Sequence, residues 1–93
     1  MSVTVRIPTI LRTYTGGASE LTVSPTEDTL AAVIEALEVA APGIRARVLD
    51  DTGALRRFVN IYVDDDDVRF TDGLATPTPD GAKISIIPAV AGG

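Results

Sequence analysis

Hydrophobic and polar residues alternate over residues 3–7, where valine or isoleucine occupies every second position. This two-residue period is typical of a strand with one buried face. A second apolar stretch, Leu21-Thr22-Val23, follows the pair Gly16-Gly17, which indicates a turn. We therefore expect two neighbouring strands, joined as a hairpin by a long connection over residues 9–19.

A helical period replaces the alternation after residue 28. Asp28 or Thr29 can cap the start of a helix, and Pro42-Gly43 can end it. The intervening apolar side chains stand at offsets of 0, +3, +4, +7 and +11 and so share one helical face: Leu30, Val33, Ile34, Leu37 and Ala41. The pattern predicts one amphipathic helix that covers one face of a sheet.

The second half of the chain returns to strand patterns. The stretch FVNIYV at residues 58–63 predicts a strand. Residues 64–67 are four aspartates, and Val68-Arg69-Phe70 predicts the return strand of a second hairpin. Residues 83–87 predict a last strand, which Pro88 closes.

The order of the predicted elements is strand, strand, helix, strand, strand, strand. This order fits an α+β domain in which one helix packs on one face of a mixed sheet of four to five strands. The last strand, from Lys83, is apolar enough to lie beside the first, from Val3, in the centre of the sheet. By length the chain is one domain, which we assign to residues 1–88, followed by a flexible tail over residues 89–93.

Composition argues against several classes of function. The net charge of −5 speaks against nucleic acid or an anionic membrane as a partner. The chain contains no cysteine and no histidine, so we expect no metal site and no catalysis by this chain alone. The first residues show no secretory signal, and no apolar run approaches the ~18 residues of a membrane span. We therefore expect a cytoplasmic protein.

The most informative residues are the last two, Gly92-Gly93. Glycine has no Cβ, so such an end can thread a channel too narrow for side chains. The five residues after Pro88 reach at most ~17 Å. A terminal carboxylate is an anion at neutral pH and a poor electrophile, so its use as a reagent requires activation, for example as an acyl-adenylate. A sulfur donor would then form a thiocarboxylate, and an amine would form an amide conjugate; a merely frayed end is the alternative.

The chain resembles the ubiquitin-like sulfur carriers of the MoaD/ThiS superfamily. The tail IIPAVAGG carries this resemblance, together with the Asp-Gly pair that precedes its strand. The stretches VTVRIPTILR, RFVNIYVDDDDVRF and GLAT resemble, more narrowly, the carriers that serve cysteine biosynthesis in actinobacteria. The similarity covers essentially the whole chain and is least diagnostic over residues 16–20 and 40–51.

The resemblance implies a β-grasp fold and a defined chemistry at the end of the chain. Gly93 would be adenylated by an ATP-dependent enzyme of the ubiquitin-activating type and converted to a thiocarboxylate. The sulfur would attack an aminoacrylate on the pyridoxal phosphate (PLP) of a cysteine synthase that uses O-phosphoserine. A zinc metallopeptidase would then release cysteine. We expect Val90, Ala91 and Gly92 to be recognised in extended form by these partners, with ATP, PLP and zinc (Zn) bound by the partners.

Two other functions remain open for the same end of the chain. One is the small subunit of molybdopterin synthase, which is also a sulfur carrier. The other is a protein modifier, joined through Gly93 to lysine side chains of substrates. A plain interaction module with an incidental tail is the third alternative.

Three further features have a structural and a functional interpretation. We interpret residues 64–67 as a solvated turn, with a contact to a basic partner or a metal site as alternatives. We expect Ile10 and Leu11 to cap the core rather than to contact a partner. The basic side chains of the next segment are expected to form a solvated face, or else to pair with a partner enzyme: Arg45, Arg47, Arg56 and Arg57. The same segment holds three expected satellite contacts of the core: Val48, Leu49 and Leu55.

Overall fold

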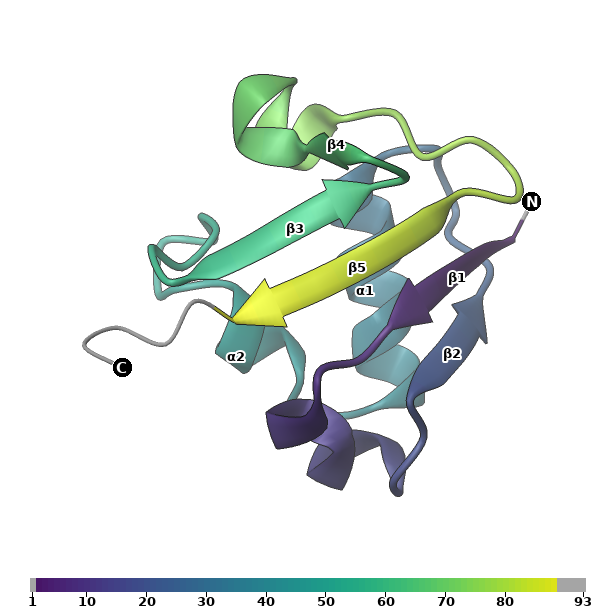
Figure 1. Cartoon of the computed structure of the whole chain (residues 1–93), viewed down its shortest axis with the longest axis vertical. Coiled ribbons are helices and arrows are strands. Elements are labelled where there is room, and N and C mark those ends of the chain that lie inside the picture. Colours follow the sequence, from purple (N-terminus) through teal and green to yellow (C-terminus); the bar gives the residue numbers. More distant parts are fainter. Residues whose placement is uncertain (1, 89–93) are drawn as a thin grey trace.

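The computed structural model describes residues 2–88 and shows a five-stranded mixed sheet with one main helix across one face (Figure 1). The strand order is β2-β1-β5-β3-β4. The strands are β1 (Val3–Arg6), β2 (Glu20–Val23), β3 (Val59–Val63), β4 (Asp66–Asp67) and β5 (Lys83–Pro88). The helices are α1 (Leu30–Ala40) and α2 (Arg45–Val48), with 3-10 turns η1 (Thr9–Thr15), η2 (Val68–Phe70) and η3 (Gly73–Ala75).

Strand β5 lies in the centre of the sheet, as the sequence predicts. It pairs in parallel with β1, where Val5 is opposite Ile84, and antiparallel with β3, where Ile61 is opposite Ile86. Strand β1 pairs antiparallel with β2, so the first predicted hairpin is confirmed. The two halves of the sheet are therefore joined through the last strand of the chain.

The core lies between the sheet and α1. Alternate residues of the three central strands face inward and are buried: Val3, Val5, Val59, Ile61, Val63, Ile84 and Ile86. The predicted helical stripe meets them, with Leu30, Val33, Ile34 and Leu37 at most 2% exposed. The strand and helix periods of the sequence thus converge on one hydrophobic layer.

Helix α1 begins at the predicted cap. The Oγ1 atom of Thr29 accepts a hydrogen bond from the Ala32 N–H at 3.3 Å, so Thr29, and not Asp28, is the N-cap residue. After the helix ends, Gly43 has a positive φ of 99°. A Cβ atom at Gly43 would lie 3.0 Å from the ring of Tyr14, so a side chain is disfavoured by both the backbone conformation and the neighbouring ring.

Residues 68–70 do not form the predicted strand, and this prediction is wrong. The return strand of the second hairpin is the short β4, which pairs with Tyr62 and Val63. Asp67 then ends the strand, because its Oδ1 accepts the N–H of Arg69 at 2.9 Å and caps η2. The predicted polar turn is confirmed for Asp64 and Asp65, with Asp64 at a positive φ of 55°, whereas Asp66 and Asp67 form β4.

The connection over residues 9–19 contains η1, which the sequence analysis did not predict. Within it Leu11 is buried while Ile10 is 64% exposed, so the capping role is confirmed for Leu11 and wrong for Ile10.

In the segment before β3, Val48 is fully buried and belongs to the main core. Leu49 and Leu55 form a bridge and pack half-buried against that core, as satellites.

Glu38 joins the end of α1 to the start of α2. Its carboxylate accepts the N–H of Gly43 at 3.0 Å and the N–H of Arg45 at 2.8 Å. These two backbone hydrogen bonds, the one from Gly43 first, lower the pKa of Glu38 from its ordinary value of 4.5. The ionised form is therefore the one that stabilises the connection between the helices.

Substitution of Gly43 by alanine is expected to destabilise the protein more than the same substitution at Gly53. Both positions have positive φ, so each alanine should cost about 1–2 kcal/mol of backbone strain. Only at Gly43 does the new Cβ meet a ring, because nothing lies within 4 Å of a Cβ at Gly53. Urea unfolding should show Gly43→Ala less stable than Gly53→Ala by about 1 kcal/mol or more. Equal losses would contradict the role assigned to Tyr14.

The stabilisation by Glu38 should depend on pH. Because the folded-state pKa lies below the unfolded value of about 4.5, the contribution is fully present above pH 5 and is lost as pH falls through the folded-state pKa. Urea unfolding should therefore show Glu38→Gln less stable than the native chain at pH 7, with the difference shrinking toward pH 3. A difference independent of pH would exclude the ionised carboxylate as its source.

Candidate functional site

The candidate site is the carboxyl end of β5, from which the chain leaves the sheet. Val59 is opposite Pro88 and Asn60 is opposite Ile87, so the strand is paired with β3 to its last residue. Ile86 points into the core at 4% exposure, whereas Ile87 lies on the outer face at 46%. The end of β5 is thus held in two ways: the side chain of Ile86 is buried in the core, and the backbone is paired with β3.

The residues assigned to the sulfur chemistry lie outside the described part of the chain. They are Val90, Ala91, Gly92 and Gly93. Their roles, and the division into a domain over 1–88 and a tail over 89–93, stay predictions. What the structure does place is the point from which these residues depart.

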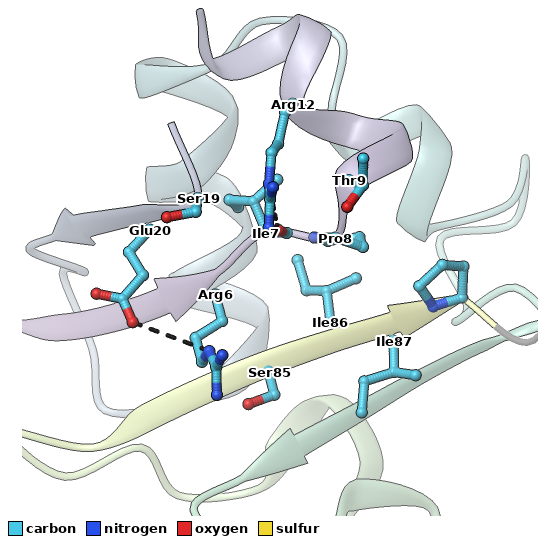
Figure 2. Close-up of a pocket in the computed structure, with 11 residues that line it drawn as sticks. Arg6, Ile7, Pro8, Thr9, Arg12, Ser19, Glu20, Ser85, Ile86 and Ile87 are labelled. Carbon is cyan, nitrogen blue, oxygen red and sulfur yellow. Dashed lines mark hydrogen bonds and ion pairs between the residues drawn. The ribbon is translucent and has the colours of Figure 1, made fainter. Parts of the chain in front are cut away.

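A groove of about 440 Å³ opens beside this point (Figure 2). We name it the exit groove. It is lined by Arg6, Ile7, Pro8, Thr9, Arg12, Ser19, Glu20, Ser85, Ile86, Ile87 and Pro88. Strand β5 thus supplies one wall, while the end of β1 and the start of η1 supply the other.

Two arginines set the electrostatics of the exit groove. The Nε–H of Arg12 donates to the carbonyl oxygen of Ile7 at 3.1 Å, which fixes the plane of the guanidinium. Arg6 lies 3.9 Å from the carboxylate of Glu20, and since both side chains are more than half exposed this pair is weakly held. Figure 2 shows Arg6 and Ser85 on neighbouring strands of this groove.

Sequence analysis did not identify the exit groove. The alternation of β1 places Arg6 on the outer face of the sheet, and the last strand is expected beside the first, but nothing in the sequence gives the register of the two strands. The parallel pairing of β1 with β5 brings Arg6 opposite Ser85, and η1 turns Arg12 back over the end of β1. One residue in the sequence did point to this region: Pro8 follows the first strand and indicates that the chain leaves the sheet there.

The aspartates of the second hairpin lie at the other end of β5. The N–H of Asp64 donates to the carbonyl oxygen of Lys83 at 2.7 Å, and Asp64 Oδ1 accepts the N–H of Lys83 at 3.1 Å. Since β5 spans about 17 Å from Lys83 to Pro88, this acidic turn is remote from the carboxyl end of the strand, and none of its aspartates lines the exit groove. Within residues 2–88, no three His, Cys, Asp or Glu side chains are arranged to hold a metal ion.

Three of the four arginines near α2 make contacts within the domain. Arg45 pairs with Glu35, and the Nε–H of Arg56 donates to the Ala46 carbonyl at 3.0 Å. Arg47 donates to the hydroxyl of Tyr14 at 2.7 Å, with its guanidinium carbon 5.8 Å from the ring centroid. These contacts support the structural interpretation of the cluster and tie η1 to α2.

No helix within residues 2–88 combines the length and the apolar character needed to cross a bilayer. This observation concerns residues 2–88, which contain α1 as their longest helix.

Comparison with known proteins places the chain in a family. Residues 5–93 match the ThiS family. The chain is 57% identical to the sulfur carrier protein CysO of Mycobacterium tuberculosis, with both chains fully covered. The crystal structure of that protein superposes with a TM-score of 0.86, over 95% of this chain and 99% of the other, at 54% identity.

Two further relatives define the range of similarity. The crystal structure of the Amycolatopsis orientalis BexX/CysO complex contains a chain that superposes with a TM-score of 0.88, over 98% of this chain and 99% of that one, at 46% identity. The small archaeal modifier protein 3 of Haloferax volcanii is 35% identical over 65 residues, which cover 70% of each chain. The Mycobacterium tuberculosis relative is named as a sulfur carrier and the Haloferax volcanii relative as a modifier protein. The five-stranded sheet crossed by one helix is the β-grasp fold, and the chain belongs to the ThiS family.

Proposed function

We propose that this chain is a sulfur carrier for cysteine biosynthesis that acts through the carboxylate of Gly93. The observation that carries the proposal is the 57% identity to a named sulfur carrier protein over the full length of both chains. The ThiS match extends to residue 93, and the central strand β5 leads directly toward that end. The proposed reagent is the main chain, consistent with the absence of cysteine and histidine from the sequence.

The proposed chemistry balances without an oxidant or a reductant at the carrier. The Gly93 carboxylate attacks the α-phosphate of ATP, releasing pyrophosphate and forming an acyl-adenylate. A donor of sulfide-level sulfur displaces AMP and leaves a thiocarboxylate. That sulfur would add to the β-carbon of an aminoacrylate supplied by the partner synthase, with a proton taken up at the α-carbon. Once the amino group is freed from the synthase, the acyl group would move from sulfur to nitrogen. Hydrolysis of the resulting amide releases cysteine and restores the carboxylate.

Each reactive cofactor in this scheme belongs to a partner. We propose an ATP-dependent adenylating enzyme, a PLP-dependent cysteine synthase and a zinc metallopeptidase that releases cysteine. The complex of a CysO with BexX in Amycolatopsis orientalis supports the idea that a carrier of this type docks on a second protein. The cytoplasm, where ATP is available, is the expected site of this chemistry.

Removal of Gly93 should abolish sulfur loading and leave the fold intact, since the described domain ends five residues earlier. The native chain and the shortened chain would each be incubated with the adenylating enzyme, ATP and a sulfide source. Intact-protein mass spectrometry should show replacement of one oxygen by sulfur in the native chain only. Circular dichroism provides the control for folding, and equal loading of both chains would refute the proposal.

Protein modification is the second candidate, because a relative named as a small archaeal modifier protein shares 35% identity over 70% of each chain. In that case the activated Gly93 would acylate lysine side chains of other proteins. Expression of a tagged chain in its own cells should then give high-mass conjugates on denaturing gels, all absent when Gly93 is deleted. Absence of conjugates under conditions that give cysteine-linked carrier would leave only the sulfur-carrier function.

A further inference from the structure

The short distance between Pro88 and Gly93 limits where a partner enzyme can bind this protein. Five residues follow Pro88, and a fully extended segment of that length spans at most ~17 Å. An enzyme that acts on Gly93 must therefore bring its own surface close to the end of β5. Since Pro88 lines the exit groove, this groove lies inside the contact area. The inference that follows rests on the proposed function and adds the partner contact to it.

The exit groove combines apolar walls with an oriented positive group. Ile87 and Pro88 form part of one wall and Pro8 part of the other. Arg12 is half-buried and uses its Nε–H on the Ile7 carbonyl. That bond fixes the plane of the guanidinium through its Nε–H. The two terminal nitrogens of Arg12 can then donate two parallel hydrogen bonds to a carboxylate.

The two ends of β5 differ in charge. The chain as a whole carries a net charge of −5, and the four aspartates 64–67 lie at the opposite end of β5. The exit groove instead contains Arg6 and Arg12, with Glu20 as its one acidic side chain. The complementary occupant is therefore acidic, with an apolar neighbour that can pack on the prolines and isoleucines.

We propose that the exit groove docks a peptide segment of the adenylating enzyme in which Asp or Glu stands beside an apolar side chain. The partner carboxylate accepts hydrogen bonds from the terminal nitrogens of Arg12, and the apolar side chain packs against Pro8, Ile87 and Pro88. Arg12 thus positions the body of the carrier and takes no part in chemistry at Gly93. Its contribution belongs to association, which is measured by KM.

The test compares two variants that change the net charge by the same amount. Arg12→Gln removes the docking cation, whereas Lys83→Gln removes a cation that lies outside the groove lining, at the start of β5. In the loading assay with adenylating enzyme, ATP and a sulfide source, Arg12→Gln should raise KM for the carrier about tenfold with kcat unchanged. Lys83→Gln should stay within about twofold, because its effect is only long-range.

A second variant protects the test against a folding defect. Arg12→Gln also loses the bond to the Ile7 carbonyl, so its stability must be measured by urea unfolding. Ser85→Glu leaves that bond in place and puts a competing carboxylate into the groove, since Ser85 lines it. This variant should show the same rise in KM. A KM within twofold of the native value for folded Arg12→Gln and for Ser85→Glu would overturn the proposal.

The partner segment can be identified directly. A photo-crosslinking residue at Thr9, which lines the groove, should capture one peptide of the adenylating enzyme. That peptide must contain Asp or Glu, and its replacement by Arg should restore loading of an Arg12→Glu carrier. A captured peptide without an acid, or capture of a second carrier chain, would overturn the assignment.

The two proposals fail in different ways. If the native chain is loaded, the chain without Gly93 is not loaded, and Arg12→Gln loads with native KM, then only the docking proposal is wrong. If the chain without Gly93 is loaded, the proposed function is wrong whatever Arg12 does.

Discussion

The structure depends on the burial of β5 between β1 and β3. Its inward residues Ile84 and Ile86 are at most 4% exposed, and its backbone is paired on both sides. The ladder with β1 covers residues 83–85 and the ladder with β3 covers residues 84–88, so the two ladders overlap where Ile84 is buried. This arrangement fixes the position of Pro88, the last described residue, which is paired with Val59 of β3.

The regular elements could be predicted because their periods are unambiguous. Alternating valines and isoleucines identify β1 and β3, and the five-residue stripe identifies α1, because a buried face forces the sequence into the period of the element. The central place of β5 follows from its apolar sequence. Where side-chain hydrogen bonds to the backbone decide the conformation, the pattern is insufficient. Asp67 caps η2 and so turns Val68 into a helical turn where its neighbours indicate a strand.

One part of the candidate site could be predicted from the sequence and another could not. The importance of Gly92-Gly93 could be read from the residues, since the absence of side chains is itself the property that matters. The exit groove could not be read in that way, because Arg6, Arg12 and Ser85 come from three separate elements. The parallel register of β1 with β5 brings Arg6 opposite Ser85. The 3-10 turn η1 then places Arg12 over the end of β1. Local periodicity carries information about which face is buried but not about the register in which neighbouring strands pair.

The pairing of β1 with β5 has a consequence for how the protein is made. Translation releases β1 first and β5 last, and before β5 emerges the sheet consists of two separate ribbons, β2-β1 and β3-β4. Neither ribbon alone has a partner for the edge that faces the missing strand, and ribbons of two strands are marginally stable in water. Ribosomes that stop early therefore yield chains without a closed core, which cellular proteases can remove. Closure of the core therefore waits for the synthesis of β5, the last of the described strands in sequence order.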